Sequence, residues 1–206
     1  MTLTNTLTPA HFEMMAELER SFYSEEFITP PEQAYAWYVR YPHTALAALD
    51  GSRVAGFVNL FPVKEPVMER LIGGLLNDRE LTHEDIADIH ASGTAPLHMF
   101  LCCIAVAKEY RRQRVTRALL RAAVAQYAPV ADRCGQIVTD NVTAEGERFS
   151  LRYGFLPVRP SDHASRVYIQ SYKSFAARVN DGPYPAQGAV FDPPPADGSV
   201  PPAFKL

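Results

Sequence analysis

The segment from Leu97 to Ala128 restricts the fold of this chain more than any other, because its pattern changes once from strand to helix. Residues 97–106 form an unbroken apolar run of strand length, as expected for a strand buried on both faces of a sheet. From Val115 the apolar residues recur at spacings of three and four, which places them on one face of a helix. The segment therefore predicts a buried strand, a polar loop and a helix.

Four arginines lie in this loop and in the first turn of the predicted helix, at Arg111, Arg112, Arg114 and Arg117. The first amides of a helix have no partner within the helix, and the positive end of the helix dipole lies there. This end of a helix therefore favours an anion, and guanidinium groups add bidentate partners for a phosphate. The pattern predicts a phosphate-binding loop. A solvated basic turn is the alternative that charge alone leaves open.

The same loop resembles a known motif. Residues 110–120 read YRRQRVTRALL and are similar to the acyl-CoA-binding motif of the GCN5-related N-acetyltransferase (GNAT) superfamily, whose loop reads Arg/Gln-x-x-Gly-x-Gly/Ala after an apolar strand. Arg111 takes the leading basic position, whereas Arg114 and Thr116 stand where the family usually has glycines. Glycine suits such loops because it reaches left-handed backbone angles, which cost another residue about 1–2 kcal/mol. We therefore expect either a right-handed loop or a weakened donor site.

A second stretch resembles the family's other motif, a helix that ends in Tyr-x-x-x-Gly-Phe. The ending here is Gly154-Phe155, and Ser150 stands where family members often place the tyrosine that reprotonates the leaving thiolate. Tyr153 is out of phase with that position by nearly a full turn, and Asn141 is about two residues further from Gly-Phe than is usual. The resemblance implies that Ser150 occupies the catalytic position and that Asn141 belongs to the cofactor site.

The resemblance implies an α/β (α+β) fold with a mixed, mostly antiparallel central sheet of about six to seven strands, flanked by helices on both faces. It implies an N-acyltransferase that uses acetyl-CoA or another acyl-CoA as co-substrate and transfers the acyl group to a primary amine by direct attack in a ternary complex. The alternative is a catalytically degenerate protein of this fold that binds CoA or a protein partner as a regulatory module. The implied donor site comprises Ile104, Ala105, Val106, Arg111, Arg112, Gln113, Arg114, Val115, Thr116, Arg117 and Asn141.

The candidate base is His98, near the start of the predicted central strand. An ammonium group must lose a proton before it can attack, and a positioned base adds about 10²–10⁴ in rate. Some family members carry a Glu or His on this strand. Two-residue alternation places His98 on the same face as Phe100, Cys102 and Ile104, although a structural or exposed histidine is the commoner case. Alternation also places Cys102 and Cys103 on opposite faces, and we expect them to be small core residues rather than nucleophiles.

Composition limits the remaining classes of protein. The chain has 206 residues, 47% of them hydrophobic, and a net charge of -3, which suits one globular domain and disfavours a general nucleic-acid binder. Its three cysteines form neither a disulfide framework nor a metal-binding pattern, so we expect no metal. The first fifteen residues show no positively charged region followed by an apolar core, the pattern of a signal peptide, and no run approaches a membrane span. We expect a cytoplasmic monomer or homodimer that acts on a small-molecule or peptide amine and binds neither nucleic acid nor a membrane.

The rest of the chain supplies supporting elements and two additions. The pattern predicts a first helix after Thr8-Pro9, and an inward face of this helix includes Phe12, Met15, Ala16, Glu19, Phe22 and Tyr23. Further expected elements are a second helix from Pro30 to Tyr41, a hairpin over 44–63, and strands over 135–139, 156–159 and 166–172. The domain is expected to span residues 1–180. Residues 64–96 form a helical insertion that either covers the acceptor site or is a passive flap, and residues 181–206 form a proline-rich tail.

Overall fold

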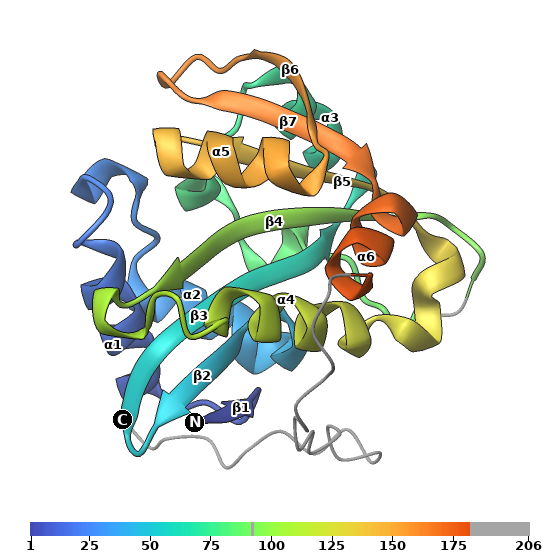
Figure 1. Cartoon of the computed structure of the whole chain (residues 1–206). Coiled ribbons are helices and arrows are strands. Elements are labelled where there is room, and N and C mark those ends of the chain that lie inside the picture. Colours follow the sequence, from blue (N-terminus) through green and yellow to red (C-terminus); the bar gives the residue numbers. More distant parts are fainter. Residues whose placement is uncertain (92, 182–206) are drawn as a thin grey trace.

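A computed structural model describes residues 1–91 and 93–181 of the chain and contains one seven-stranded sheet (Figure 1). In chain order the strands are β1 (Thr2–Thr4), β2 (Leu46–Asp50), β3 (Arg53–Val63), β4 (Leu97–Val106), β5 (Cys134–Asn141), β6 (Leu156–Pro160) and β7 (Arg166–Ser171). Across the sheet they are ordered β1-β2-β3-β4-β5-β7-β6, and only β4 and β5 run parallel. The predicted mixed, mostly antiparallel sheet is confirmed. The predicted proline-rich tail lies, except for Asp181, outside the described residues.

Helices cover both faces of this sheet. Those in the described residues are α1 (Pro9–Glu19), α2 (Pro31–Arg40), α3 (Glu65–Gly73), α4 (Val115–Gln126), α5 (Ala144–Tyr153) and α6 (Tyr172–Asn180). Helices α4, α5 and α6 lie on one face, and α1, α2 and α3 lie on the other (Figure 1). None of the helices in the described part of the chain is both long and apolar enough to span a bilayer.

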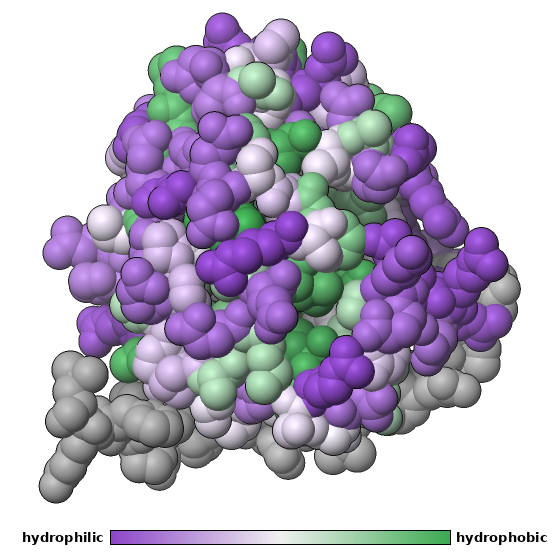
Figure 2. All heavy atoms as spheres, turned by 90° about the vertical axis from the view of Figure 1, so that its left-hand side faces the viewer, coloured by the Kyte–Doolittle hydropathy of each residue, from purple (hydrophilic) through white to green (hydrophobic). Residues whose placement is uncertain are grey.

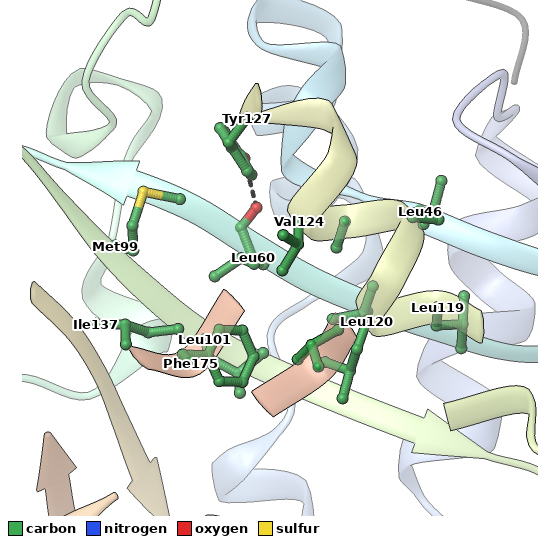
Figure 3. Packing of buried hydrophobic residues seen from close by; sticks show 14 of the residues in the cluster. Leu46, Leu60, Met99, Leu101, Leu119, Leu120, Val124, Tyr127, Ile137 and Phe175 are labelled. Carbon is green, nitrogen blue, oxygen red and sulfur yellow. Dashed lines mark hydrogen bonds between the residues drawn. The ribbon is translucent and has the colours of Figure 1, made fainter. Parts of the chain in front are cut away.

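The strand, loop and helix predicted over residues 97–128 are confirmed by β4 and α4. The apolar face of α4 buries Leu119 and Leu120 against the sheet, where they meet Leu60 and Leu101 (Figure 3). Each fully buried leucine contributes about 1.5–3 kcal/mol relative to an exposed one. Tyr127 ends the helix in this core, and its hydroxyl donates a hydrogen bond of 2.6 Å to the carbonyl oxygen of Leu60 (Figure 3). The position of α4 beneath β3 and β4 is therefore firmly set.

A β-bulge interrupts β4 at Cys102. Asn59 of β3 pairs with Cys103, and the next residue of β3, Leu60, pairs with Leu101, so Cys102 has no partner on β3. An extra residue of this kind shifts the alternation of the side chains that follow. Cys102 packs against the apolar cluster beneath α3, and Cys103 belongs to the cluster beneath α1 and α2. Both cysteines therefore face the same side of the sheet, and the prediction that they face opposite sides is wrong.

The bulge also corrects the alternation predicted for His98. Leu101 and Ile104 both pack with the cluster beneath α4, although they are three residues apart. His98 lies between Leu97 and Met99, whose side chains also face α4, so its own side chain faces the opposite side. His98 and Ile104 are thus on opposite faces of β4, roughly 20 Å apart along the strand.

Residues 64–86 of the predicted insertion form a packed layer over the face that carries α1 and α2. Helix α3 buries Val67, Met68 and Leu71 in a cluster that includes Trp37 of α2 and Phe100 of β4. Two short 3-10 turns follow, η3 (Asp78–Glu80) and η4 (His83–Asp85). The Gln33 side chain on α2 donates hydrogen bonds of 2.9 and 2.7 Å to carbonyl oxygens of residues 79 and 81. The insertion therefore has a fixed position, and it carries η3 to the edge of β4.

Candidate active site

The parallel strands β4 and β5 separate halfway along β4 (Figure 1). β5 pairs with β4 at Leu97, Met99 and Phe100, and from Gln136 to Asn141 it pairs with β7 on its other side. From residue 101 to 106 the edge of β4 that faces β5 has no strand partner in the described part of the chain, while its other edge pairs with β3. An unpaired strand edge offers backbone N–H and C=O groups to an extended ligand. The predicted donor-site residues of the strand, 104–106, lie on this open edge.

The loop that leads from β4 to α4 is anchored to the hairpin of β2 and β3. The Tyr110 hydroxyl donates a hydrogen bond of 2.7 Å to the Asp50 carboxylate, and Arg53 pairs with Glu109 at 2.8 Å. Gly56 allows β3 to approach the end of β4 closely, because a Cβ there would lie 2.8 Å from a β4 carbonyl oxygen. These contacts fix the point at which the loop leaves the open edge.

The loop adopts the left-handed conformation that glycine favours. Arg112 and Arg114 have φ angles of 69° and 65°, each at a cost of about 1–2 kcal/mol. The alternative of a right-handed loop is therefore wrong, and Thr116 lies within α4, where no glycine is needed. The backbone amides of Arg112, Val115 and Thr116 donate to no acceptor in the part of the chain that the structure describes. The N-terminus of α4 thus presents backbone donors suited to an anion.

Three side chains of the loop and of the first turn of α4 make contacts within the protein. The Arg111 guanidinium lies over the Phe22 ring, 4.9 Å from its centroid, and so links the loop to the residues that follow α1. The Gln113 amide donates a hydrogen bond of 3.0 Å to a carbonyl of its own loop. The Arg117 guanidinium donates a bond of 3.5 Å to a carbonyl at the carboxyl end of α6. Gln113 and Arg117 therefore make contacts that stabilise the fold, whereas Arg111 joins the two sides of the site.

Two cavities meet at Cys102 on the face of β4 opposite α4. The first lies between α1, α2 and the sheet, and its polar lining includes Glu19 and Asn59. The second lies between the insertion and the end of β5, and its polar lining includes Asp78 and Asp140. On the side of the molecule where β4 and β5 diverge, Figure 2 shows several apolar patches among hydrophilic side chains. Cavities that combine apolar walls with carboxylates at fixed points can orient a substrate that carries a cation.

Asp78 stands at the junction of the two cavities. Its carboxylate accepts hydrogen bonds of 3.3 Å from the Cys102 thiol and 3.3 Å from the Thr29 hydroxyl. Burial raises the pKa of Asp78, and these hydrogen bonds offset part of that rise. Burial and the negative charge of Asp78 raise the pKa of the Cys102 thiol well above its usual range. Cys102 therefore remains a protonated donor at neutral pH rather than a nucleophile.

The far end of the second cavity is closed by the turn between β6 and β7. His163 in this turn lies 2.8 Å from the Asp140 carboxylate and 2.7 Å from Asp162, and the Ser165 hydroxyl donates a bond of 2.6 Å to Asp140. Burial alone lowers the pKa of His163, but the bonds and charges of the two carboxylates outweigh it, so the pKa is raised. The other oxygen of Asp140 is buried and has no partner among the described residues. This network fixes the turn over the end of β5.

The open edge of β4 thus lies next to the Val115 and Thr116 amides, which have no acceptor among the described residues. A family model described as "Acetyltransferase (GNAT) family" matches residues 12–155. The chain belongs to this family. The match includes the open edge of β4, the loop and helices α4 and α5. A search of curated proteins found no match.

Solved structures of GNAT proteins share the fold. The GphF GNAT-like decarboxylase in complex with isobutyryl-CoA is 13% identical, with a TM-score of 0.57 over 80% of this chain and 96% of that chain. Ard1 from Thermoplasma volcanium is 15% identical, with a TM-score of 0.54 over 82% and 96%. Arabidopsis thaliana NAA60 in complex with a bisubstrate analogue is 15% identical, with a TM-score of 0.51 over 80% and 94%. At these identities the likeness shows the fold alone.

Asn141 and Ser150, which the GNAT motif implicates, bond to each other. The Asn141 amide donates a hydrogen bond of 2.7 Å to the Ser150 hydroxyl, and Ser150 is fully buried. Gly146 lies so close to Asn141 that a Cβ there would be 2.8 Å from its side-chain oxygen. Tyr153 stacks on Phe149, with ring centroids 4.6 Å apart. In this structure Ser150 joins α5 to β5, and its hydroxyl is not exposed as an acid that protonates a substrate must be.

The structure does not bring His98 to the open edge of β4. His98 lines neither cavity, and its Nδ1 atom is buried without a hydrogen-bond partner among the described residues. Alternation still places His98 on the face of Phe100 and Cys102, as predicted, but not on that of Ile104, and its role as base stays a prediction. Glu19, Asp78 and Asp140, which line the cavities, were not predicted as site residues. For Glu19 the signal is present in the sequence, because an acidic residue there continues the apolar inward face of α1.

Proposed function

We propose that this GNAT-family protein is an acyl-CoA-dependent N-acyltransferase that uses acetyl-CoA or another acyl-CoA as donor. The observation that carries this proposal is the open edge of β4 next to the N-terminus of α4, where the Val115 and Thr116 amides have no acceptor in the described residues. The pantetheine arm would lie along residues 104–106, and the diphosphate would bind the amides and the guanidinium groups of Arg112 and Arg114. A backbone N–H of the open edge would stabilise the thioester oxygen as negative charge develops on it.

The proposed acceptor is a primary amine, either a small molecule or a peptide. Ammonium groups favour carboxylates, and the cavities across β4 from α4 hold Glu19, Asp78 and Asp140. With donor and acceptor held on one strand, the amine attacks the thioester directly in a ternary complex. Correct placement of two reactants can supply about 7–11 kcal/mol of the barrier reduction, which exceeds the contribution of a single base.

Ser150 favours a second candidate function. It replaces the tyrosine of the family motif and is bonded to Asn141 inside the fold, so a conventional acid is missing at that position. A protein of this kind would bind CoA or a partner protein as a regulatory module and would transfer no acyl group. Fold alone does not separate the two functions.

Turnover separates the two candidate functions. We expect the wild-type protein to bind acetyl-CoA and to release free thiol from it when a suitable amine is present. Thiol release would be measured against a panel of polyamines, amino acids, aminoglycosides and peptide N-termini, with tertiary amines as controls that form no amide. Binding of acetyl-CoA without thiol release above the tertiary-amine controls would support the regulatory module and contradict the transferase.

A further inference from the structure

Glu19 lies on the side of the proposed site where the acceptor would bind. It is the last residue of α1, its carboxylate lines the first cavity, and its side chain faces Cys103 on β4. Cys103 lies beyond Phe100, where β4 has already separated from β5. The bulge at Cys102 turns Cys103 toward α1. Glu19 is therefore one side chain away from the open edge where the thioester would lie.

The donor loop approaches the same end of α1. Arg111 stacks on Phe22, which follows Glu19 by three residues. The contact of Arg111 with Phe22 thus places the donor loop next to the segment that follows Glu19. The Glu19 carboxylate can therefore contact an acceptor while the loop before α4 binds the donor.

The carboxylate of Glu19 forms no ion pair with a described residue. The neighbouring Arg20 pairs with Glu25 instead. The groups that face Glu19 are Arg20 and Tyr23 from its own end of the chain, Cys102 and Cys103 from β4, and Asp78 from the insertion. An ammonium group in the cavity would supply an ion-pair partner.

These surroundings also set the proton affinity of Glu19. Burial raises its pKa to about 7, the hydrogen bond with Cys103 lowers it, and the charge of Asp78 raises it further. Burial and the charge of Glu19 raise the pKa of the Cys103 thiol well above its usual range, so Cys103 stays protonated and can donate to the carboxylate. A carboxylate with a pKa close to neutrality is suited to accept a proton in the working range of an enzyme.

We propose that Glu19 is the base of this active site and takes the proton of the acceptor ammonium. This inference rests on the proposed acyltransferase function and names a catalytic residue for it. Glu19 accepts one proton from the ammonium, and the amine lone pair then attacks the thioester carbon. The C–N bond forms and the C–S bond breaks. A second proton passes from nitrogen to the departing sulfur, which gives an amide and the free thiol of CoA, and Glu19 releases its proton to water. The Cys103 thiol is a positioning group, because its hydrogen bond holds the carboxylate against β4.

The test compares Glu19→Gln with Glu17→Gln, which changes an exposed glutamate on the same helix. In Glu19→Gln we expect kcat/KM to fall by about 10²-fold or more at pH 8, with an unchanged affinity for acetyl-CoA. The wild-type kcat/KM should decrease as the pH drops below about 7. This decrease at acid pH should disappear in Glu19→Gln but remain in Glu17→Gln. A Glu19→Gln enzyme that keeps the wild-type rate and the wild-type decrease at acid pH overturns the proposal.

A second measurement tests the proposed protonation of Glu19 without an activity assay. In the wild-type protein, one glutamate carboxyl carbon observed by ¹³C NMR should titrate near pH 7 and should be missing in Glu19→Gln. Titration of Glu19 near its ordinary pKa, in the range of exposed glutamates, overturns the proposal. Failure of the wild-type protein to bind any acyl-CoA would instead count against the proposed function, so the two failures can be told apart.

Discussion

Replacing Glu19 by glutamine should stabilise the fold at high pH while it removes activity. The pKa of Glu19 is raised from 4.5 to about 7, mainly by burial, so the folded state holds the proton more tightly than the unfolded state does. Between these two values the free energy of unfolding falls as pH rises, and above pH 7 the full cost of the buried charge is present. A shift of this size corresponds to about 3 kcal/mol. Because the cavity keeps the carboxylate partly hydrated, we expect about 2 kcal/mol.

Urea denaturation of wild-type protein and Glu19→Gln at pH 5 and pH 8.5 would measure this effect. We expect the variant to be the more stable protein at pH 8.5 and its advantage to be about 2 kcal/mol larger there than at pH 5. Glu17→Gln should follow the wild-type protein at both pH values, since Glu17 is exposed. An advantage that does not grow with pH, or a variant that is less stable at pH 8.5, would refute the electrostatic reasoning.

Three further predictions concern residues of the candidate site and of the turns that hold it in place. Gly74→Ala should cost about 2 kcal/mol or more in urea denaturation, because φ is +67° and the new Cβ would lie 2.8 Å from the turn between β6 and β7. Gly51→Ala, with φ +60° and open space, should cost only about 1 kcal/mol, and equal costs would contradict the close contact. Arg112→Gly should stabilise the fold by about 1 kcal/mol because φ is 69°, yet weaken acetyl-CoA binding in calorimetry; unchanged affinity would exclude this guanidinium from the site. His163→Asn should lower the free energy of unfolding by about 1 kcal/mol below pH 6.5. The raised pKa of His163 stabilises the folded state at low pH, and this stabilisation disappears as the pH rises through that pKa. An equal loss at pH 9 would contradict the charged pair with Asp140.

The pattern of apolar residues was sufficient to predict the central elements. The strand over 97–106 and the helix from Val115 follow from one change of period, and both were found with their predicted starts. Helix α6 was missed, although Ser171 as N-cap and Tyr172, Phe175 and Val179 at helical spacing carry a signal for it. Strand β1, with three residues, is too short to show a period.

The candidate site was less predictable, because it depends on contacts between distant parts of the chain. No pattern in the apolar sequence of β4 signals the bulge at Cys102, yet the bulge reverses the face of every later side chain in the strand. Asp78 looks like an ordinary polar residue of a loop, and only the packing of α3 against the sheet carries it to the cavity. Arg112 and Arg114 adopt glycine-like angles because anchoring contacts of the loop override their local preference.

Calorimetric titration with acetyl-CoA and with S-acetylpantetheine, which lacks the diphosphate and the adenosine 3′-phosphate, tests the proposed anion site at the start of α4 most directly, together with a charge reversal at that site. We expect acetyl-CoA to bind with a micromolar dissociation constant and S-acetylpantetheine at least 100-fold more weakly. Arg112→Glu should weaken acetyl-CoA binding at least tenfold, while Arg159→Glu on the exposed strand β6 should leave it unchanged. Equal affinity for the two compounds, or no binding of acetyl-CoA, would contradict a diphosphate site at this helix.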